Sequence, residues 1–241
     1  MIYRSVNIEW LGHAGFKIKS SKAVVYIDPF KIYSNLSDEE GLGFDDSPVS
    51  TGGIEKADFI FITHSHFDHC SIEDINKIAK DNTVIVCSAD CQSKFRHINK
   101  KVIIKPLECG NQLEFEEFGV RVWAVHSYNI NKNFHTREED WNGYVIQLDE
   151  VKVYHAGDTD LIPEMKNLNN MNIDFALLPI GGTYTMNAGE AAKAASVIKA
   201  KYSIPMHFGT VDRTGDKSEA DVFLKNCGLF GVEGKVLEKI G

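Results

Sequence analysis

Three histidines and an aspartate lie within six residues of one another in the first third of the chain. The segment runs from His64 to His69 in the pattern H-x-H-x-D-H, and it follows an apolar run at residues 58–63. Histidine makes up only 9 of the 241 residues, so composition alone does not account for this density. Imidazole and carboxylate groups are common ligands of zinc and related divalent metals. The segment therefore predicts a metal site, and a polar turn with surface histidines is the weaker interpretation.

A strand and a helix are expected to position this cluster. The β-branched and aromatic run at residues 58–63 is typical of a buried strand. After the cluster, Ser71 is a good N-cap for a helix whose apolar residues Ile72, Ile75 and Ile78 recur at helical spacing. The cluster then lies on a short strand-to-helix connection, where α/β proteins often place functional residues.

Three further candidate ligands come after predicted strands. His126 follows the apolar run 120–125, Asp158 follows the run 151–154, and His207 follows the run 202–206. Alone, His126 would more often be structural, and a bare Gly-Asp pair is common. Their place at strand ends is typical of functional residues in α/β proteins but does not by itself make them ligands.

The composition is that of an ordinary globular protein. The 27.0 kDa chain is 43% hydrophobic and 25% charged, which predicts a single domain over residues 1–241. The net charge of -8 disfavours nucleic acid as a partner, and a small-molecule substrate is expected instead. The five cysteines form no paired framework, the N-terminus lacks an apolar signal core, and no apolar run reaches membrane-spanning length. A cytoplasmic location without membrane association is therefore expected, and a homo-oligomer stays open.

The motif H-x-H-x-D-H after an apolar strand resembles the metal-binding motif of the metallo-β-lactamase superfamily. The segments 10–13 (WLGH), 27–29 (IDP), 154–159 (YHAGDT) and 205–210 (PMHFGT) are most similar to the UlaG-like group of metal-dependent hydrolases. That group includes an ascorbate-phosphate lactonase, but the motif is shared too widely for its substrate to be carried over. The resemblance implies an α/β (α+β) fold, a four-layer αββα sandwich. Periodicity alone predicts only one α/β or α+β domain.

The resemblance also implies a complete set of ligands for two divalent metal ions, Zn, Mn or Fe. The first metal would be held by His64, His66 and His126, the second by Asp68, His69 and His207, with Asp158 bridging both. Two such metals share a water and lower its pKa, so that the resulting hydroxide attacks an ester, lactone or phosphoester of a small molecule. Asp68 is also a catalytic candidate, because a carboxylate can accept a proton or orient the nucleophile.

Other residues are expected around these ligands. Asp28 would accept a proton from a ligand imidazole and fix its tautomer, and His155 is a second such supporting residue. His13 in the first turn, His135 in the polar loop 127–142, and Thr183 in the glycine-rich turn 181–185 are expected to contact substrate. The irregular segment 31–56 is a candidate lid.

Two other functions stay open. Relatives in the same superfamily cleave RNA or DNA phosphodiesters with the same metals, although an acidic chain disfavours this. A non-catalytic metal-binding protein is the other, although the complete ligand set argues against it. Asp158 stands where some lactam-cleaving members have Cys, and His66 stands where the di-iron redox branch has an acidic residue. Antibiotic cleavage and the reduction of oxygen or NO are therefore disfavoured.

Overall fold

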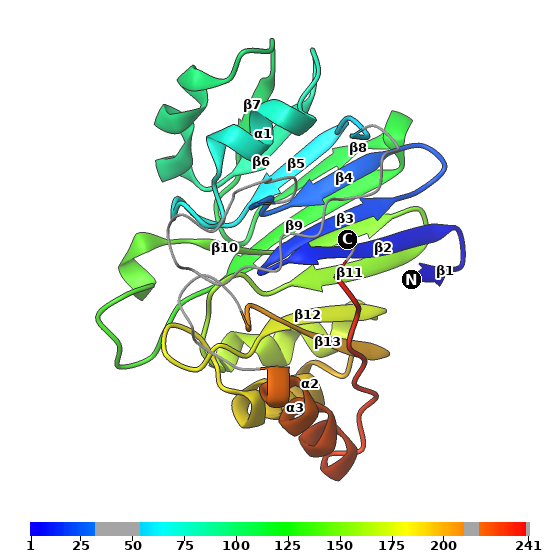
Figure 1. Ribbon diagram of the computed structural model, residues 1–241, viewed down its shortest axis with the longest axis vertical. Coiled ribbons are helices and arrows are strands. Elements are labelled where there is room, and N and C mark those ends of the chain that lie inside the picture. The colour runs from blue at the N-terminus through cyan, green and yellow to red at the C-terminus, as the bar shows by residue number, and fades with distance from the viewer. Residues whose placement is uncertain (32–53, 210–216, 240–241) are drawn as a thin grey trace.

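Two β-sheets lie face to face in the computed structural model, and helices cover their outer faces (Figure 1). The structure describes residues 1–31, 54–209 and 217–239. The α/β fold class and the four-layer arrangement expected from the sequence are confirmed. The candidate lid at 31–56 falls mostly on residues 32–53, which lie outside the described residues. Within the described ranges, no helix has the length and apolar character needed to cross a membrane.

The first sheet changes from antiparallel to parallel at its middle. The strands β1 to β4 pair antiparallel, and β4 to β7 pair parallel. In spatial order its strands are β1 (Ile2–Tyr3), β2 (Val6–Gly12), β3 (Gly15–Lys19), β4 (Val24–Ile27), β5 (Phe59–Ile62), β6 (Val84–Cys87) and β7 (Ile103–Pro106).

The second sheet has the same mixed character. The strands β8 to β11 pair antiparallel, whereas β11, β12 and β13 are parallel. In spatial order its strands are β13 (Tyr202–Met206), β12 (Phe175–Pro179), β11 (Val151–His155), β10 (Asn142–Leu148), β9 (Val120–His126) and β8 (Gln112–Phe115).

The buried strand β5 shows how the layers form. Its four side chains are all buried and alternate between two cores. Phe59 and Phe61 face the second sheet, where Phe61 packs against Tyr144. Ile60 and Ile62 face the outer helices instead. This double burial explains why the sequence run before the His/Asp segment is continuously apolar.

Helices close both outer faces. The helix α1 (Ile72–Ile78) and a 3₁₀ helix at Ala89–His97 share a core with β5 and β6. The helix α2 (Ala188–Ile198) lies on β12 and β13, next to α3 (Lys217–Leu229) and a 3₁₀ helix at Pro163–Met171. Two further short 3₁₀ turns are Glu116–Phe118 and Arg137–Glu139.

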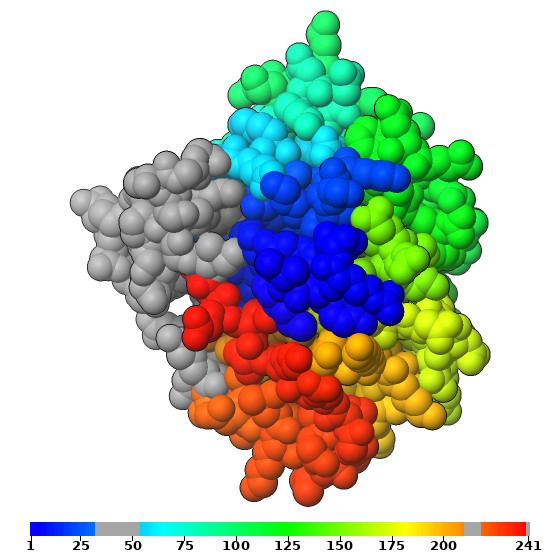
Figure 2. Space-filling model, turned by 90° about the vertical axis from the view of Figure 1, so that its right-hand side faces the viewer, coloured from blue at the N-terminus to red at the C-terminus, as the bar shows by residue number. Residues whose placement is uncertain are grey.

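The predicted start of α1 agrees with the structure, and α2 also begins at a capping residue. The Ser71 side chain caps α1 by accepting from the Asp74 backbone N–H, and Asn187 and Glu190 form a capping box at α2. Residues 235–238 form no strand, and the C-terminal segment lies along the N-terminal strands through an isolated bridge between Trp10 and Lys239 (Figure 2).

Candidate metal centre

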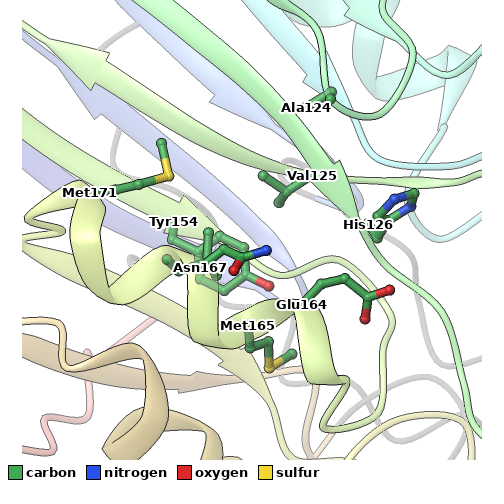
Figure 3. Close-up of a pocket in the computed structure, with 10 residues that line it drawn as sticks. Ala124, Val125, His126, Tyr154, Glu164, Met165, Asn167 and Met171 are labelled. Carbon is green, nitrogen blue, oxygen red and sulfur yellow. The ribbon is translucent and has the colours of Figure 1, made fainter.

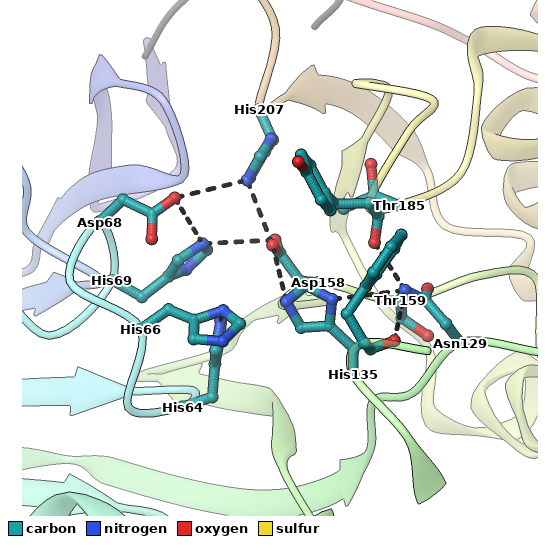
Figure 4. Close-up of polar contacts among 12 residues, drawn as sticks. His64, His66, Asp68, His69, Asn129, His135, Asp158, Thr159, Thr185 and His207 are labelled. Atoms are coloured by element: carbon teal, nitrogen blue, oxygen red, sulfur yellow. Dashed lines mark hydrogen bonds and ion pairs between the residues drawn. The ribbon is translucent and has the colours of Figure 1, made fainter. Parts of the chain in front are cut away.

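The ends of β5, β11 and β13 bring distant His and Asp residues to one place at the edge of the sandwich (Figure 4). The strands β11 and β13 are both parallel to β12, and the grouping of His64 and His69 with Asp158 places the end of β5 on the same side of the molecule. The turn after β5 is tight, because the backbone N–H groups of His69 and Cys70 both donate to the His66 carbonyl. This turn places His66, Phe67 and Asp68 where they line a pocket at the edge of the sandwich.

One group of candidate ligands consists of Asp68, His69 and His207 together with His13. Their ligand atoms lie within 4.8 Å of one another. His13 Nε2 lies 2.9 Å from Asp68 Oδ2, and the His207 backbone N–H donates to the His13 carbonyl at 3.0 Å. The first hairpin and the loop after β13 are thereby joined. His13 was expected to contact substrate, but it lies among the ligands, buried beside Asp68.

A second group consists of His64, His66 and His135. The Nε2 atom of His64 lies 3.1 Å from Nδ1 of His66. Two imidazole nitrogens at this distance need a proton or a cation between them. The third member, His135, comes from the loop between β9 and β10 rather than from a strand end.

Asp158 lies between the two groups. Its carboxylate is 3.4 Å from His69 Nε2, 3.2 Å from His207 Nε2 and 3.3 Å from His135 Nε2. This is the position of a carboxylate able to bridge two metals. The neighbouring carboxylate of Asp160 is engaged elsewhere, in an ion pair with Lys132 at 2.5 Å.

The turn before Asp158 can accommodate only glycine. Gly157 has φ +64°, and a Cβ there would lie 2.9 Å from both the Asn142 carbonyl oxygen and Ser127 Oγ. His155 supports the same turn. Its ring accepts from the Gly157 backbone N–H at 3.2 Å, and its Nε2–H donates to the Ala14 carbonyl at 2.8 Å. Both ring nitrogens are thus used away from the centre, as expected for a supporting residue.

Asp28 fixes two imidazoles. Its carboxylate accepts from His69 Nδ1–H at 2.7 Å and from the Thr63 hydroxyl at 2.6 Å. The Thr63 oxygen in turn accepts from His64 Nδ1–H at 2.9 Å. This network assigns the protons to the Nδ1 atoms of both rings, so that both Nε2 atoms are left as ligands. The arrangement is the one the sequence analysis expects for Asp28.

The carboxylates make the centre favourable for positive charge. Against the opposing effect of burial, Asp158, Asp68 and Asp28 raise the pKa of His69 well above its ordinary value. Asp158 also raises the pKa of His207. Burial with the neighbouring His207 lowers the pKa of His13 to about 4, so this ring is neutral and donates to Asp68. A site that stabilises imidazolium in this way also stabilises a divalent cation.

Several buried atoms in the centre have no hydrogen-bond partner among the described residues. They include His69 Nε2, His135 Nε2, Asp158 Oδ1 and His207 Nε2. Buried polar atoms are normally satisfied, and leaving one unpaired costs about 1–3 kcal/mol. The unpaired atoms face one another and are of the types that bind zinc or manganese. The donor set therefore fits one or more divalent metal ions.

Comparison with known proteins agrees with this geometry. A family model described as a beta-lactamase superfamily domain matches residues 7–207. A UPF0173 metal-dependent hydrolase of Thermococcus onnurineus is 36% identical over 85% of each chain. Another from Koribacter versatilis is 34% identical over 94% of this chain and 95% of its own. The chain belongs to the metallo-β-lactamase superfamily. The solved metallo hydrolase of Ignicoccus hospitalis shares the fold, with a TM-score of 0.74, 22% identity and coverage of 98% of this chain and 96% of that one.

The prediction that His126 is a ligand of this metallo-β-lactamase centre is wrong. His126 lies outside the centre and lines a separate cavity of about 190 Å³ with Tyr154, Glu164 and Met165 (Figure 3). The side chains that lie near His126 and could bind a metal together with it are Cys109 and Asp140. The family resemblance pointed to the histidine that ends β9, but a later histidine, in the loop that follows, takes this place.

The loop after β9 places His135 where His126 was expected. The Asn129 backbone N–H donates to the His135 carbonyl at 2.6 Å, and Asn129 Nδ2 donates to Phe134 O and Tyr184 O. His135 takes a left-handed backbone with φ 54° and is buried. The expectation that His135 contacts only substrate is corrected, since its Nε2 lies 3.3 Å from Asp158. No local sequence pattern encodes this folding back of the loop.

Trp141 is a site residue that the sequence analysis missed. Its ring lies 4.6 Å from that of His64, 4.8 Å from His66 and 5.3 Å from His135, measured between centroids. The indole Nε1–H donates to Asp90 at 2.9 Å. Trp141 therefore forms the wall behind the second group of ligands. An isolated tryptophan after an acidic stretch gives no sequence indication of this role.

A pocket of about 290 Å³ opens onto the centre. It is lined by His66, Phe67, Asp68, Phe134, His135, Asp158, Tyr184 and His207. Thr183, which was expected to contact substrate, is exposed and is not among these residues, whereas its neighbour Tyr184 is. Three aromatic rings thus stand opposite polar ligands, so the pocket suits a small molecule with an apolar portion.

Proposed function

We propose that this metal-dependent hydrolase of the superfamily uses two metal ions to cleave an ester, lactone or phosphoester bond in a small molecule. The observation that carries the proposal is the place of Asp158, within 3.2–3.4 Å of imidazoles from both ligand groups. One group would be held by His64, His66 and His135. The other would be held by Asp68, His69 and His207.

The metals, when bound, would acidify water and polarise the scissile group. The protein's own residues prepare the site for this chemistry. Asp28 holds the Nδ1 side of His69 directly and that of His64 through Thr63, so that both Nε2 atoms are oriented towards the metals. Asp68 lies at the pocket surface, where its carboxylate can accept a proton or orient a nucleophile, and His13 fixes its position.

The size and lining of the pocket support a small substrate. At about 290 Å³ it is at the lower end of ligand pockets, and Phe67, Phe134 and Tyr184 would contact an apolar part of the molecule. The net charge of -8 argues against a nucleic-acid substrate, which needs a basic surface. A lactone or a small phosphoester is therefore favoured over RNA.

The test is a substrate screen on the purified chain loaded with Zn²⁺ or Mn²⁺. Lactones, phosphodiesters and thioesters are compared, each with chelated protein and with Asp158→Asn as controls. We expect hydrolysis of one class that is lost on chelation and reduced at least about 10²-fold in Asp158→Asn. Hydrolysis that survives in both controls would reject the proposed centre.

A further inference from the structure

A further group of metal-binding side chains lies at the base of the loop between β9 and β10. It consists of Cys109, His126 and Asp140, whose ligand atoms lie within 4.8 Å of one another. These residues take no part in the hydrolytic centre described above. We propose that Cys109, His126 and Asp140 form a separate zinc site, here called the Cys–His–Asp site.

Sheet hydrogen bonds fix the three backbones of this site. His126 ends β9 and pairs in register with Asn142 at the start of β10. The Ser127 N–H donates to the Trp141 carbonyl at 3.2 Å, which holds Asp140 close to the end of β9. The turn that carries Cys109 is held to β9 by a bond from the Gly110 N–H to Ala124 O at 2.9 Å. The three residues thus come from backbone that is already ordered.

The side chains have ligand atoms to spare. The half-buried His126 ring makes no hydrogen bond to a described residue, and its ring contact is with Tyr128 at 6.4 Å. Cys109 Sγ lies 3.2 Å from Asn142 Oδ1 and 3.5 Å from Trp141 O, which are both acceptors. A thiol surrounded by oxygen acceptors and a carboxylate lies in an environment that favours a cation.

A nucleophilic cysteine is the other chemistry that a Cys–His–Asp set suggests. Burial and the Asp140 carboxylate raise the pKa of Cys109 to about 12, whereas nucleophilic cysteines have lowered values. In a catalytic triad the carboxylate orients the histidine, but here Asp140 interacts with the thiol. A metal reverses the effect, because it displaces the thiol proton and is attracted by the same carboxylate.

The donor set points to zinc. One thiolate, one imidazole and one carboxylate are all zinc ligands, and a fourth tetrahedral position would be left for water. Tetrahedral ligand atoms are about 3.5 Å apart, so the side chains must move closer by about 1 Å. Asp140 is exposed and the other two side chains are half-buried, so rotation can close this gap.

Binding here would tie together both ends of the loop 127–139. That loop carries His135, and Trp141 follows directly after Asp140. A zinc ion would therefore stabilise the segment that completes the hydrolytic centre without touching substrate.

Cobalt provides a specific test, because a thiolate gives bound Co²⁺ an intense near-ultraviolet charge-transfer band. The hydrolytic centre has only His and Asp ligands and gives no such band. The full-length chain is stripped of metal and titrated with Co²⁺. We expect the band in the natural chain and in the matched control Cys227→Ser, and its loss in Cys109→Ser. His126→Ala should weaken Co²⁺ binding at this band by about 10-fold or more, whereas the surface variant His97→Ala should not.

A second measurement needs no variant. Alkylation of Cys109 by iodoacetamide, followed by peptide mass spectrometry, should slow several-fold when Zn²⁺ is added to the natural chain. A band that persists in Cys109→Ser, a band indifferent to His126→Ala, or alkylation unaffected by Zn²⁺ would each overturn the proposal.

Discussion

At the scale of single residues, most ligands of the candidate centre could be predicted from the sequence, but the role of His135 could not. The types and spacing of the residues from His64 to His69 predict a metal site. Asp158 and His207 could be selected because the motifs that contain them resemble those of the family. The exchange of His126 for His135 was not predictable, because it depends on hydrogen bonds from Asn129 to residues 134, 135 and 184.

The first prediction separates these two histidines. Mn²⁺ has little affinity for thiolate, so it counts the His/Asp centre alone. The natural chain should retain about two equivalents of Mn²⁺. His135→Ala should lose about one of these, because a ligand nitrogen is removed, and His126→Ala should keep both. Elemental analysis after gel filtration measures this. Equal losses in the two variants would show that His135 is wrongly assigned to the group with His64 and His66.

The second prediction concerns the carboxylate behind His69. Asp28→Asn keeps a group of the same size but weakens the acceptor for His69 Nδ1–H and for the Thr63 hydroxyl. Such supporting changes typically reduce metal affinity about 10–100-fold. Competition with a fluorescent chelator gives the dissociation constant. Affinity unchanged within experimental error would mean that Asp28 does not orient the ligand.

At the scale of elements, the strands could be predicted and their loops could not. Strand β5 is evident from its apolar run, and α1 from the cap at Ser71. The turns at the ends of the strands are sharper than sequence patterns reveal. The site residues His13, Asp28, His135 and His207 all have left-handed backbones, with φ between 42° and 56°. Non-glycine residues in this region store strain, which the surrounding structure must offset.

The third prediction uses that strain. At His207, where φ is 56°, both Ala and Gly remove the imidazole, so both variants should lose one metal. Gly adopts this backbone without strain, so His207→Gly should be more stable than His207→Ala by about 1 kcal/mol in the metal-free state. Urea unfolding of chelated protein measures the difference. If the Ala variant were the more stable one, the left-handed turn would not be a feature of the folded state.

The fourth prediction concerns the anchor of the loop that carries His135. Asn129→Ala removes the Nδ2 donor to Phe134 O and Tyr184 O, and leaves two partly buried carbonyls without this partner. We expect a loss of about 1–3 kcal/mol in unfolding free energy and weaker metal binding by the group that contains His135. The exposed neighbour Asn133→Ala is the control and should change neither quantity. Normal metal binding in Asn129→Ala would show that the loop is positioned by other contacts.

At the scale of the whole molecule, the two mixed sheets bring distant strand ends together. The carboxyl ends of β5, β11 and β13 must meet although they lie far apart in the sequence. Parallel pairing within each sheet and face-to-face packing between the sheets achieve this. The layer order was inferred from a family resemblance, because periodicity alone leaves several arrangements of the same elements. The net charge of -8 likewise does not reveal that Asp28, Asp68 and Asp158 gather around a few imidazoles.

This concentration of charge predicts opposite pH trends for metal-free and metal-loaded protein. Asp158, Asp68 and Asp28 raise the pKa of His69 well above its ordinary value, and Asp158 raises that of His207. A raised pKa in the folded state contributes stability that is fully present below the unfolded value of about 6.5. That contribution is lost as the pH rises through the folded pKa. The melting temperature of chelated protein should therefore fall as the pH rises above about 6.5.

Metal-loaded protein should behave in the reverse way over the same range. Metal binding displaces protons from the ligand imidazoles, so the dissociation constant falls as the pH rises, and the stabilisation from bound metal grows. The difference in melting temperature between loaded and chelated samples should therefore increase from about pH 6 to about pH 9. Asp158→Asn removes the first cause of the raised His69 pKa, so its chelated form should show a flatter slope. Differential scanning fluorimetry in matched buffers measures all four curves. Parallel curves for loaded and chelated protein would show that the imidazoles near Asp158 do not hold the metal.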